Sequence, residues 1–206
     1  MTVQFKYDHN GLRTQKIVTE NGVTTTTNYT LHGKLLMHMT RGTDTLHFFY
    51  DANSRPAKVK YNGTMYTYVH NLQSDIVGIV DSTGALVVEY KYDAWGRPLS
   101  VEGSLKTTLG AVNPFRYRGY VYDEETELYY LRSRYYYPKV SRFILEDRII
   151  GRRRLLQHNL YSYVCNTPVN ASDPSGQIAL DYATIEAIVE ERKARNIEVC
   201  EKYFGK

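Results

Sequence analysis

Cysteine is scarce in this chain, and long hydrophobic runs are absent. The 206 residues include two cysteines, Cys165 and Cys200, with no Cys-x-x-Cys spacing. This pattern argues against a disulfide framework and a thiolate metal site, although two thiols leave open both a single bond between them and the redox compartment. No apolar run reaches the roughly 18 residues that a membrane-spanning helix needs, and no hydrophobic signal region follows Met1. The sequence therefore predicts no transmembrane segment and no export signal of its own.

Charge of one sign is also scarce. The formal net charge is +4 at pH 7, which by itself indicates neither nucleic-acid binding nor attachment to an anionic membrane. The local excess lies at Arg148 and Arg152 to Arg154, where a solvated loop explains it better than phosphate contacts do. The six histidines are scattered without the spacing of a metal site. We therefore expect no metal, no cofactor and no nucleic-acid partner.

Tyrosine is present in excess. The chain has 20 tyrosines against 6 phenylalanines and 1 tryptophan, together with 14 glycines. Aromatic residues favour half-buried strands, and glycine favours the turns between them. A tyrosine ring packs while its hydroxyl still needs water or a polar partner, which suits a sheet that is wet on one side. The composition predicts a mainly β fold.

A repeat runs through the first hundred residues. A Tyr-Asp pair begins the same short motif three times, at Tyr7, Tyr50 and Tyr92, with spacings of 43 and 42 residues. Weaker copies near Tyr29 and Tyr68 reduce the unit to about 21 residues, within the range of short stacking repeats. In each unit an aromatic strand ends in Asp-x-x-Gly/Ser, where Asp caps the turn and Gly supplies a positive φ. The pattern predicts β-hairpins laid side by side, and it favours a scaffold over a carbohydrate site, which would need exposed rings.

Together these motifs resemble a known family, the RHS or YD-repeat proteins with their C-terminal RHS-associated core domain. The resemblance covers about residues 3–177. It is carried by the Tyr-Asp repeats and by four segments, Asn71 to Gly96, Phe115 to Tyr120, Leu128 to Tyr136 and Asn159 to Gly176. Teneurins, insecticidal toxin-complex C subunits and wall-associated bacterial proteins share this architecture.

The resemblance implies an architecture and partners. Antiparallel YD-repeat hairpins in residues 1–112 would form part of a β shell, and the core in residues 113–177 would plug it. Apolar residues in 178–206 follow a helical period, which predicts a helical segment. By the resemblance, this segment would be a short passenger or a remnant of one. Expected partners are this passenger, the upstream remainder of the shell, and an immunity or delivery protein. Such proteins are secreted or displayed at the cell surface as part of a larger system, whereas the missing signal peptide keeps a cytoplasmic location open.

Two aspartates carry the chemistry that the resemblance implies. In several relatives the core cuts its own chain after an Asp-Pro-x-Gly motif in a reaction described as aspartyl-protease-like. The matching positions here are Asp147 and Asp173, with Arg142 or Arg134 to orient a carboxylate or hold oxyanion charge. One ionised carboxylate can take a proton from water while the other, kept protonated by its neighbour's charge and by burial, polarises the scissile carbonyl. The aspartates are 26 positions apart, so only folding can pair them.

The predicted cleavage motif begins at Asp173. Pro174 fixes φ, and Gly176 allows a sharp turn or a close approach of the backbone to the carboxylates. The predicted scissile bond joins Gln177 to Ile178, with Gly176–Gln177 as the neighbouring candidate. Without the resemblance, Asp-Pro-Ser-Gly is an ordinary turn.

Two functions of different classes remain open at this point. One is a single-turnover aspartyl-type autoprotease that frees an enclosed passenger, as in polymorphic toxins. The other is a catalytically inactive structural or adhesion module that binds a partner or carbohydrate. Both hypotheses predict the β shell, so the geometry around Asp147 and Asp173 is what bears on the choice between them.

Overall fold

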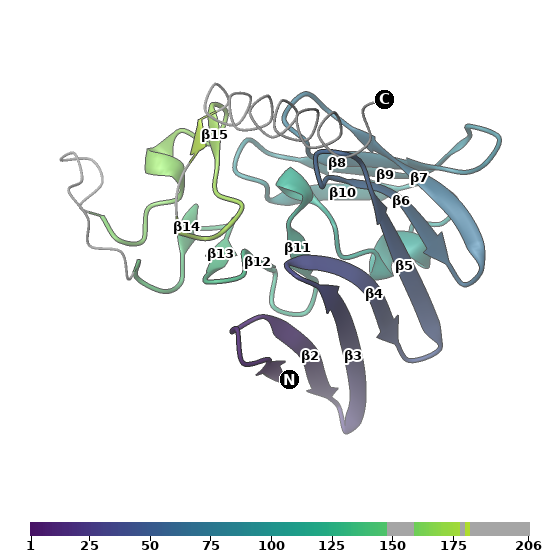
Figure 1. The fold of residues 1–206 in the computed structure, drawn as a ribbon, viewed down its shortest axis with the longest axis horizontal. Coiled ribbons are helices and arrows are strands. Elements are labelled where there is room, and N and C mark those ends of the chain that lie inside the picture. Colours follow the sequence, from purple (N-terminus) through teal and green to yellow (C-terminus); the bar gives the residue numbers. More distant parts are fainter. Residues whose placement is uncertain (148–158, 178–179, 182–206) are drawn as a thin grey trace, which may run out of the picture.

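The computed structural model describes residues 1–147, 159–177 and 180–181, and a single antiparallel strip dominates it (Figure 1). Ten consecutive strands form this strip in sequence order, each paired with the next. Their bounds are β1 Thr2–Tyr7, β2 Arg13–Glu20, β3 Val23–His32, β4 Leu35–Arg41, β5 Asp44–Tyr50, β6 Pro56–Tyr61, β7 Thr64–His70, β8 Ile76–Val80, β9 Leu86–Tyr92 and β10 Pro98–Glu102. The mainly β fold and the strip of hairpins predicted from the sequence are confirmed.

The turns of the strip use the predicted aspartate cap. At the turn after β5, Asp51 Oδ1 accepts the backbone N–H groups of Asn53 at 2.8 Å and Arg55 at 2.9 Å. The same pair of contacts recurs at the related turns, at Asp8, Asp81, Asp93 and, through an amide oxygen, Asn71. Each cap satisfies two turn N–H groups locally, which fixes where one hairpin ends and the next begins.

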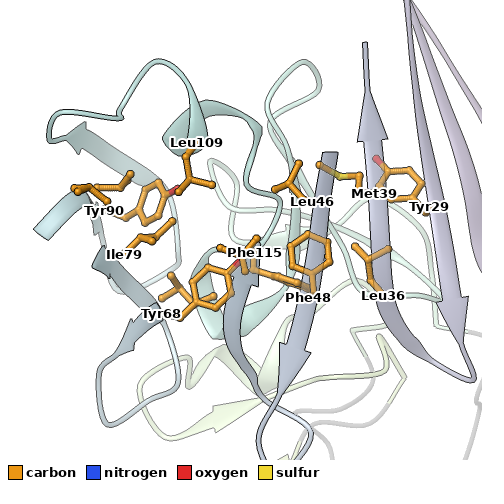
Figure 2. Packing of buried hydrophobic residues seen from close by; sticks show 14 residues of the cluster. Tyr29, Leu36, Met39, Leu46, Phe48, Tyr68, Ile79, Tyr90, Leu109 and Phe115 are labelled. Atoms are coloured by element: carbon orange, nitrogen blue, oxygen red, sulfur yellow. The ribbon is translucent and has the colours of Figure 1, made fainter. Parts of the chain in front are cut away.

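One hydrophobic core lies against the inner face of the strip. Strand alternation turns Leu46 and Phe48 of β5 inward, where each is almost fully buried. The chain after β10 returns over this face through the short helix α1 (Leu109–Val112) and covers it with Phe115. Figure 2 shows Phe115 between Phe48 and Tyr68, with the Phe48 and Phe115 rings 4.9 Å apart and edge to face. Burial of each such side chain stabilises the fold by roughly 1.5–3 kcal/mol.

A second core is rich in tyrosine, which supplies five of its nine buried residues in the described part of the chain. After the 3-10 turn η1 (Tyr117–Gly119), a small antiparallel sheet follows with strands β11 Val121–Asp123, β12 Leu128–Tyr130, β13 Tyr135–Tyr137 and β14 Arg142–Phe143. The chain then passes through the 3-10 turn η3 (Val164–Asn166) and β15 (Ala171–Ser172), which pairs with β16 (Leu180–Asp181). The buried members of this core are Tyr117, Tyr120, Tyr129, Leu131, Tyr136, Phe143, Tyr163, Val164 and Ala171.

The tyrosine hydroxyls find partners inside the protein. Tyr129 donates to the carbonyl of Gly96 at 2.7 Å, and Tyr136 donates to that of Trp95 at 2.8 Å. Tyr50 and Tyr92, which belong to the Tyr-Asp motifs, likewise donate to backbone carbonyls of the strip. The expected polar partner is therefore often a backbone carbonyl rather than water, which explains why phenylalanine does not replace these tyrosines.

A buried ion cluster fastens the start of the strip to the second sheet. The guanidinium of Arg13 holds both carboxylate oxygens of Asp123, whose side chain is fully buried. Lys16 contacts the same carboxylate at 3.0 Å and reaches Glu125 at 2.6 Å, and Arg41 contacts Glu125 at 3.0 Å. Moving the second sheet away from β2 would separate these charges and leave them buried without partners, which costs free energy. The cluster therefore fixes the position of the second sheet against β2.

Two predictions fall largely beyond the described residues. The predicted helical segment 178–206 lies outside them except for Leu180–Asp181, which form β16. The arginines at 148 and 152–154 also lie outside. No helix in the described part of the chain is long and apolar enough to cross a membrane.

Candidate active site

The fold brings the two predicted aspartates to one arginine. Asp147 follows β14, Asp173 follows β15, and Arg134 immediately precedes β13. The Nη2 atom of Arg134 lies 3.4 Å from an oxygen of Asp147 and 3.4 Å from an oxygen of Asp173. The two carboxylate oxygens are therefore separated by no more than twice that distance, although their residues are 26 positions apart in the chain.

All three charged side chains are buried. Arg134 is 6% exposed, Asp147 4% and Asp173 2%. Charges removed from water interact more strongly than surface charges, and each loses hydration that its partners must replace. The guanidinium of Arg134 contacts both carboxylates, so it compensates part of the negative charge of each inside the protein.

Other contacts hold Arg134 in place. Its Nη1 donates to the carbonyl of Leu160 at 3.0 Å, and its Nε donates to the carbonyl of Gly176. Its guanidinium carbon lies 3.7 Å from the centroid of the Phe143 ring. A planar fork that donates in several fixed directions suits this position, and a lysine could not reproduce it.

The Asp-Pro-Ser-Gly motif forms a turn that Asp173 itself caps. Its Oδ1 atom accepts the backbone N–H groups of Ser175 at 3.3 Å and Gln177 at 3.1 Å. The Ser175 hydroxyl lies 3.2 Å from the same oxygen. The two carboxylate oxygens of Asp173 thus have different partners, since Oδ1 accepts hydrogen bonds from the turn and Oδ2 accepts one from Arg134.

Glycine is required at position 176 for two reasons. Its φ is +72°, a left-handed conformation that other residues adopt at a cost. A Cβ atom there would lie 2.7 Å from the carbonyl oxygen of Leu131 and 2.8 Å from the hydroxyl of Ser133. This close approach lets the Gly176 carbonyl reach Arg134. The sequence predicted an approach of the backbone to the carboxylates, and a catalytic role for Gly176 stays a prediction.

Sequence reasoning missed several residues that position the site. The Tyr120 hydroxyl accepts the backbone N–H of Asp173 at 2.8 Å and lies 3.2 Å from the hydroxyl of Tyr163. Burial raises the pKa of Tyr120, which therefore stays protonated at neutral pH. The Ser133 hydroxyl donates to the carbonyl of Ser175 at 2.7 Å. Nothing in the local sequence of Tyr120 distinguishes it from the other buried tyrosines.

The remaining predicted residues lie around this centre. Arg142 is exposed in β14, because strand alternation turns Phe143 inward and Arg142 outward. The arginine at the carboxylates is thus Arg134, the second of the two arginines considered from the sequence. Pro174 and Gln177 are exposed, and Ile178 lies outside the described residues. Within the described ranges, no three His, Cys, Asp or Glu side chains come together as a metal site would require.

Known proteins resemble this chain in sequence and in fold. The Teneurin YD-shell family model matches residues 1–169. The "tRNA3(Ser)-specific nuclease WapA" of Bacillus spizizenii is 38% identical over 178 residues, and the "tRNA nuclease WapA" of Bacillus subtilis is 39% identical over 178 residues. Each of these matches covers 84% of this chain and 7% of the relative, so the chain spans a small part of their length.

A solved structure agrees on the fold. The crystal structure of TcdB2-TccC3-Cdc42 matches with a TM-score of 0.68 at 23% identity, over 85% of this chain and 9% of that one. At this identity the likeness concerns the fold alone. The family model ends at residue 169, so Asp173 and the turn that follows it lie beyond the matched range.

Proposed function

The chain belongs to the teneurin YD-shell family of RHS/YD-repeat proteins, and on that premise we propose that it forms the wall and plug of a shell that encloses a C-terminal passenger and cuts its own chain behind Gly176. The single observation that carries the cleavage is the meeting of Asp147, Asp173 and the Gly176 carbonyl on the guanidinium of Arg134. Peptide hydrolysis by two carboxylates needs such a meeting of acids and backbone.

The proposed reaction assigns a role to each group. An ionised carboxylate takes a proton from a water molecule while the oxygen of that water attacks the scissile carbonyl carbon. The other carboxyl group, protonated, donates its proton to the reacting peptide, and the C–N bond breaks into a carboxylate and an amine. Arg134 holds the carboxylates and stabilises negative charge on the carbonyl oxygen.

The position of the guanidinium bears on which bond is cut. Its Nε contacts the carbonyl of Gly176, so Gly176–Gln177 is the peptide bond that Arg134 would polarise directly. The bond predicted from the sequence, Gln177–Ile178, lies one residue further along the chain. The two fragments that end at these positions differ by the mass of one glutamine residue, which makes the choice measurable.

Intact-mass spectrometry of the purified 206-residue chain tests this function. We expect the chain to convert on incubation into two fragments, with a boundary after Gly176 or Gln177. Asp173→Asn and Asp147→Asn should each leave the chain intact. Asp81→Asn is the matched control, because Asp81 caps a turn with the same backbone contacts as Asp173 but lies in the strip. A wild-type chain that stays whole, or cutting that survives Asp173→Asn, contradicts the proposal.

A second function is favoured by a specific observation. Asp173 caps its own turn and also pairs with Arg134, so the same contacts would hold an inert plug in place. In that case the chain is a structural or adhesion module that binds a partner or carbohydrate. The relatives named as nucleases support a toxin-related setting, in which the shell is secreted or displayed at the cell surface and handles a passenger.

A further inference from the structure

A small cavity lies between the inner face of the strip and the loop that carries the site. Its volume is about 130 Å³, well above the roughly 10–15 Å³ that a single water molecule needs. Leu36 and Tyr50 contribute to its wall from the strip, and Leu131, Arg132 and Pro174 contribute from the second core. The cavity thus reaches the Asp-Pro-Ser-Gly turn from the inside of the shell.

The charges around this cavity are one-sided. Among the residues that the structure describes, its lining includes Arg13, Lys34 and Arg132 but no aspartate or glutamate. Arg13 is neutralised by Asp123 in the buried ion cluster, and Lys34 is exposed to water. Arg132 is half-buried, and in the part of the chain that the structure describes no hydrogen bond or ion pair reaches its guanidinium. Among the described residues around this cavity, Arg132 is therefore the half-buried cation without a counter-ion.

The backbone of Arg132 is also in an uncommon conformation. Its φ is +67°, in the left-handed region that non-glycine residues seldom adopt. It occupies the turn closed by a 3.0 Å hydrogen bond from the N–H of Leu131 to the carbonyl of Arg134, the same turn that packs on Gly176. Burial lowers the pKa of Arg132, because a desolvated cation is less stable there than in water. An unusual conformation that exposes an uncompensated charge to a cavity is a reason to look for a ligand.

The proposed cleavage supplies an anion near this cavity. Hydrolysis leaves the oxygen of water on the acyl carbon, so a new α-carboxylate ends the core at Gly176 or Gln177. That end is two or three residues from Pro174, roughly 10 Å of chain at most. If it stayed at Arg134 it would stand beside the carboxylates of Asp147 and Asp173, where like charges repel. Arg132 on the neighbouring turn would attract the new α-carboxylate without such repulsion.

We propose that this cavity is a binding site for a peptide α-carboxylate, and that after cleavage it holds the new C-terminus of the core against Arg132. The proposal rests on the proposed function for the origin of the carboxylate. Seating the carboxylate there separates it from the released amine and keeps the cut loop attached to the core. Cleavage then becomes one-way without displacement of the plug.

The first test asks whether the uncut chain has the site. The side-chain Nε–Hε signal of Arg132 is followed by NMR in an Asp147→Asn chain and assigned by its loss in Arg132→Gln. N-acetyl-Ser-Gly-Gln with a free carboxylate should shift this signal in a saturable way. The matching peptide with a C-terminal amide should bind at least about tenfold more weakly, because a charge-assisted hydrogen bond is lost. Equal shifts with both peptides, or none with either, overturn the site.

The second test uses the self-cut chain. The Arg132 signal should already occupy its bound position without added peptide, and carboxypeptidase should trim the new C-terminus several-fold more slowly than in an Arg132→Gln chain. Arg142→Gln is the matched control, because Arg142 is exposed on β14. An unshifted Arg132 signal in the cut chain overturns occupation by the new C-terminus. A wild-type chain that binds the free peptide but never cuts itself refutes the proposed function and leaves the carboxylate site standing.

Discussion

The clearest single perturbation is Gly176→Ala, because it changes one carbon atom at the contact between the cleavage motif and the Leu131–Arg134 turn. The new Cβ would lie 2.7 Å from the Leu131 carbonyl oxygen and 3.1 Å from the Arg134 nitrogen. Both neighbours are backbone atoms and cannot rotate away. The loop must therefore move outward, which separates the Gly176 carbonyl from the Arg134 guanidinium.

The expected magnitude has two parts. An alanine held at φ +72° costs roughly 1–2 kcal/mol because its Cβ approaches the carbonyl oxygen. The overlap with the Leu131–Arg134 turn adds about 1–3 kcal/mol, as for other groups inserted into close packing. Gly84→Ala isolates the first part, because Gly84 has a φ of +85° with no atom within 4 Å of the added carbon. We expect Gly176→Ala to destabilise its loop by about 2–5 kcal/mol and Gly84→Ala to cost only the conformational part.

Hydrogen exchange measures the local effect, because the Gln177 N–H is bonded to Asp173 Oδ1 in the native turn. In an Asp147→Asn chain, which should not cut itself, Gly176→Ala should lower the protection factor of the Gln177 N–H by at least tenfold. For Gly84→Ala, urea unfolding of the whole chain should measure the loss in the free energy of unfolding. Self-cleavage of the otherwise wild-type Gly176→Ala chain should slow in parallel. If Gly176→Ala loses no more free energy than Gly84→Ala, the close approach contributes nothing and this account of the glycine is wrong.

Two further predictions concern tyrosine and histidine. Tyr120→Phe removes the acceptor for the Asp173 N–H, which should cost about 1–3 kcal/mol and slow self-cleavage; an unchanged rate with a stable fold would show that Tyr120 does not position Asp173. His47 stacks on His38 with ring centroids 4.2 Å apart, and burial, then the neighbouring His38 and Lys60, lower its pKa. Because the unfolded chain then binds more protons, stability should fall as the pH drops below the ordinary histidine value of 6.5 and through the lowered pKa. His47→Gln should reduce the loss of Tm between about pH 7.5 and 5.5, and an equal loss in both chains contradicts this.

The strip could be predicted from the sequence because its determinants are local. An aspartate, its turn and the following strand lie within a few residues of one another, as Asp51, Asn53 and Arg55 show. The device does not depend on strict sequence identity. Ser54 adopts a φ of +61° where glycine stands in the other Tyr-Asp turns, and Asn71 replaces the aspartate without loss of the two contacts.

The site could be predicted only in part, because its determinants are distant in the chain. The sequence motif named Asp147 and Asp173, but nothing in their spacing says which arginine meets them. Arg134 and Arg142 flank the same small strand pair, and alternation about Phe143 decides that Arg142 faces outward. The ion pair between Arg13 and Asp123 shows the same limit, since it joins residues 110 positions apart.

The described contacts of Arg134 join the packing of the core to the proposed chemistry. Its fork ties together Leu160, Gly176 and both aspartates, while Phe143 covers its face. Any substitution there therefore disturbs three loops as well as a reaction, and a loss of cleavage in an Arg134 variant cannot distinguish a catalytic role from a structural one. Asp147→Asn and Asp173→Asn preserve the shape of the side chain while removing its carboxyl group, so they test the chemical role of that group more directly. If either variant keeps its thermal stability and stops cutting, that carboxyl group is needed for the reaction and not for the fold.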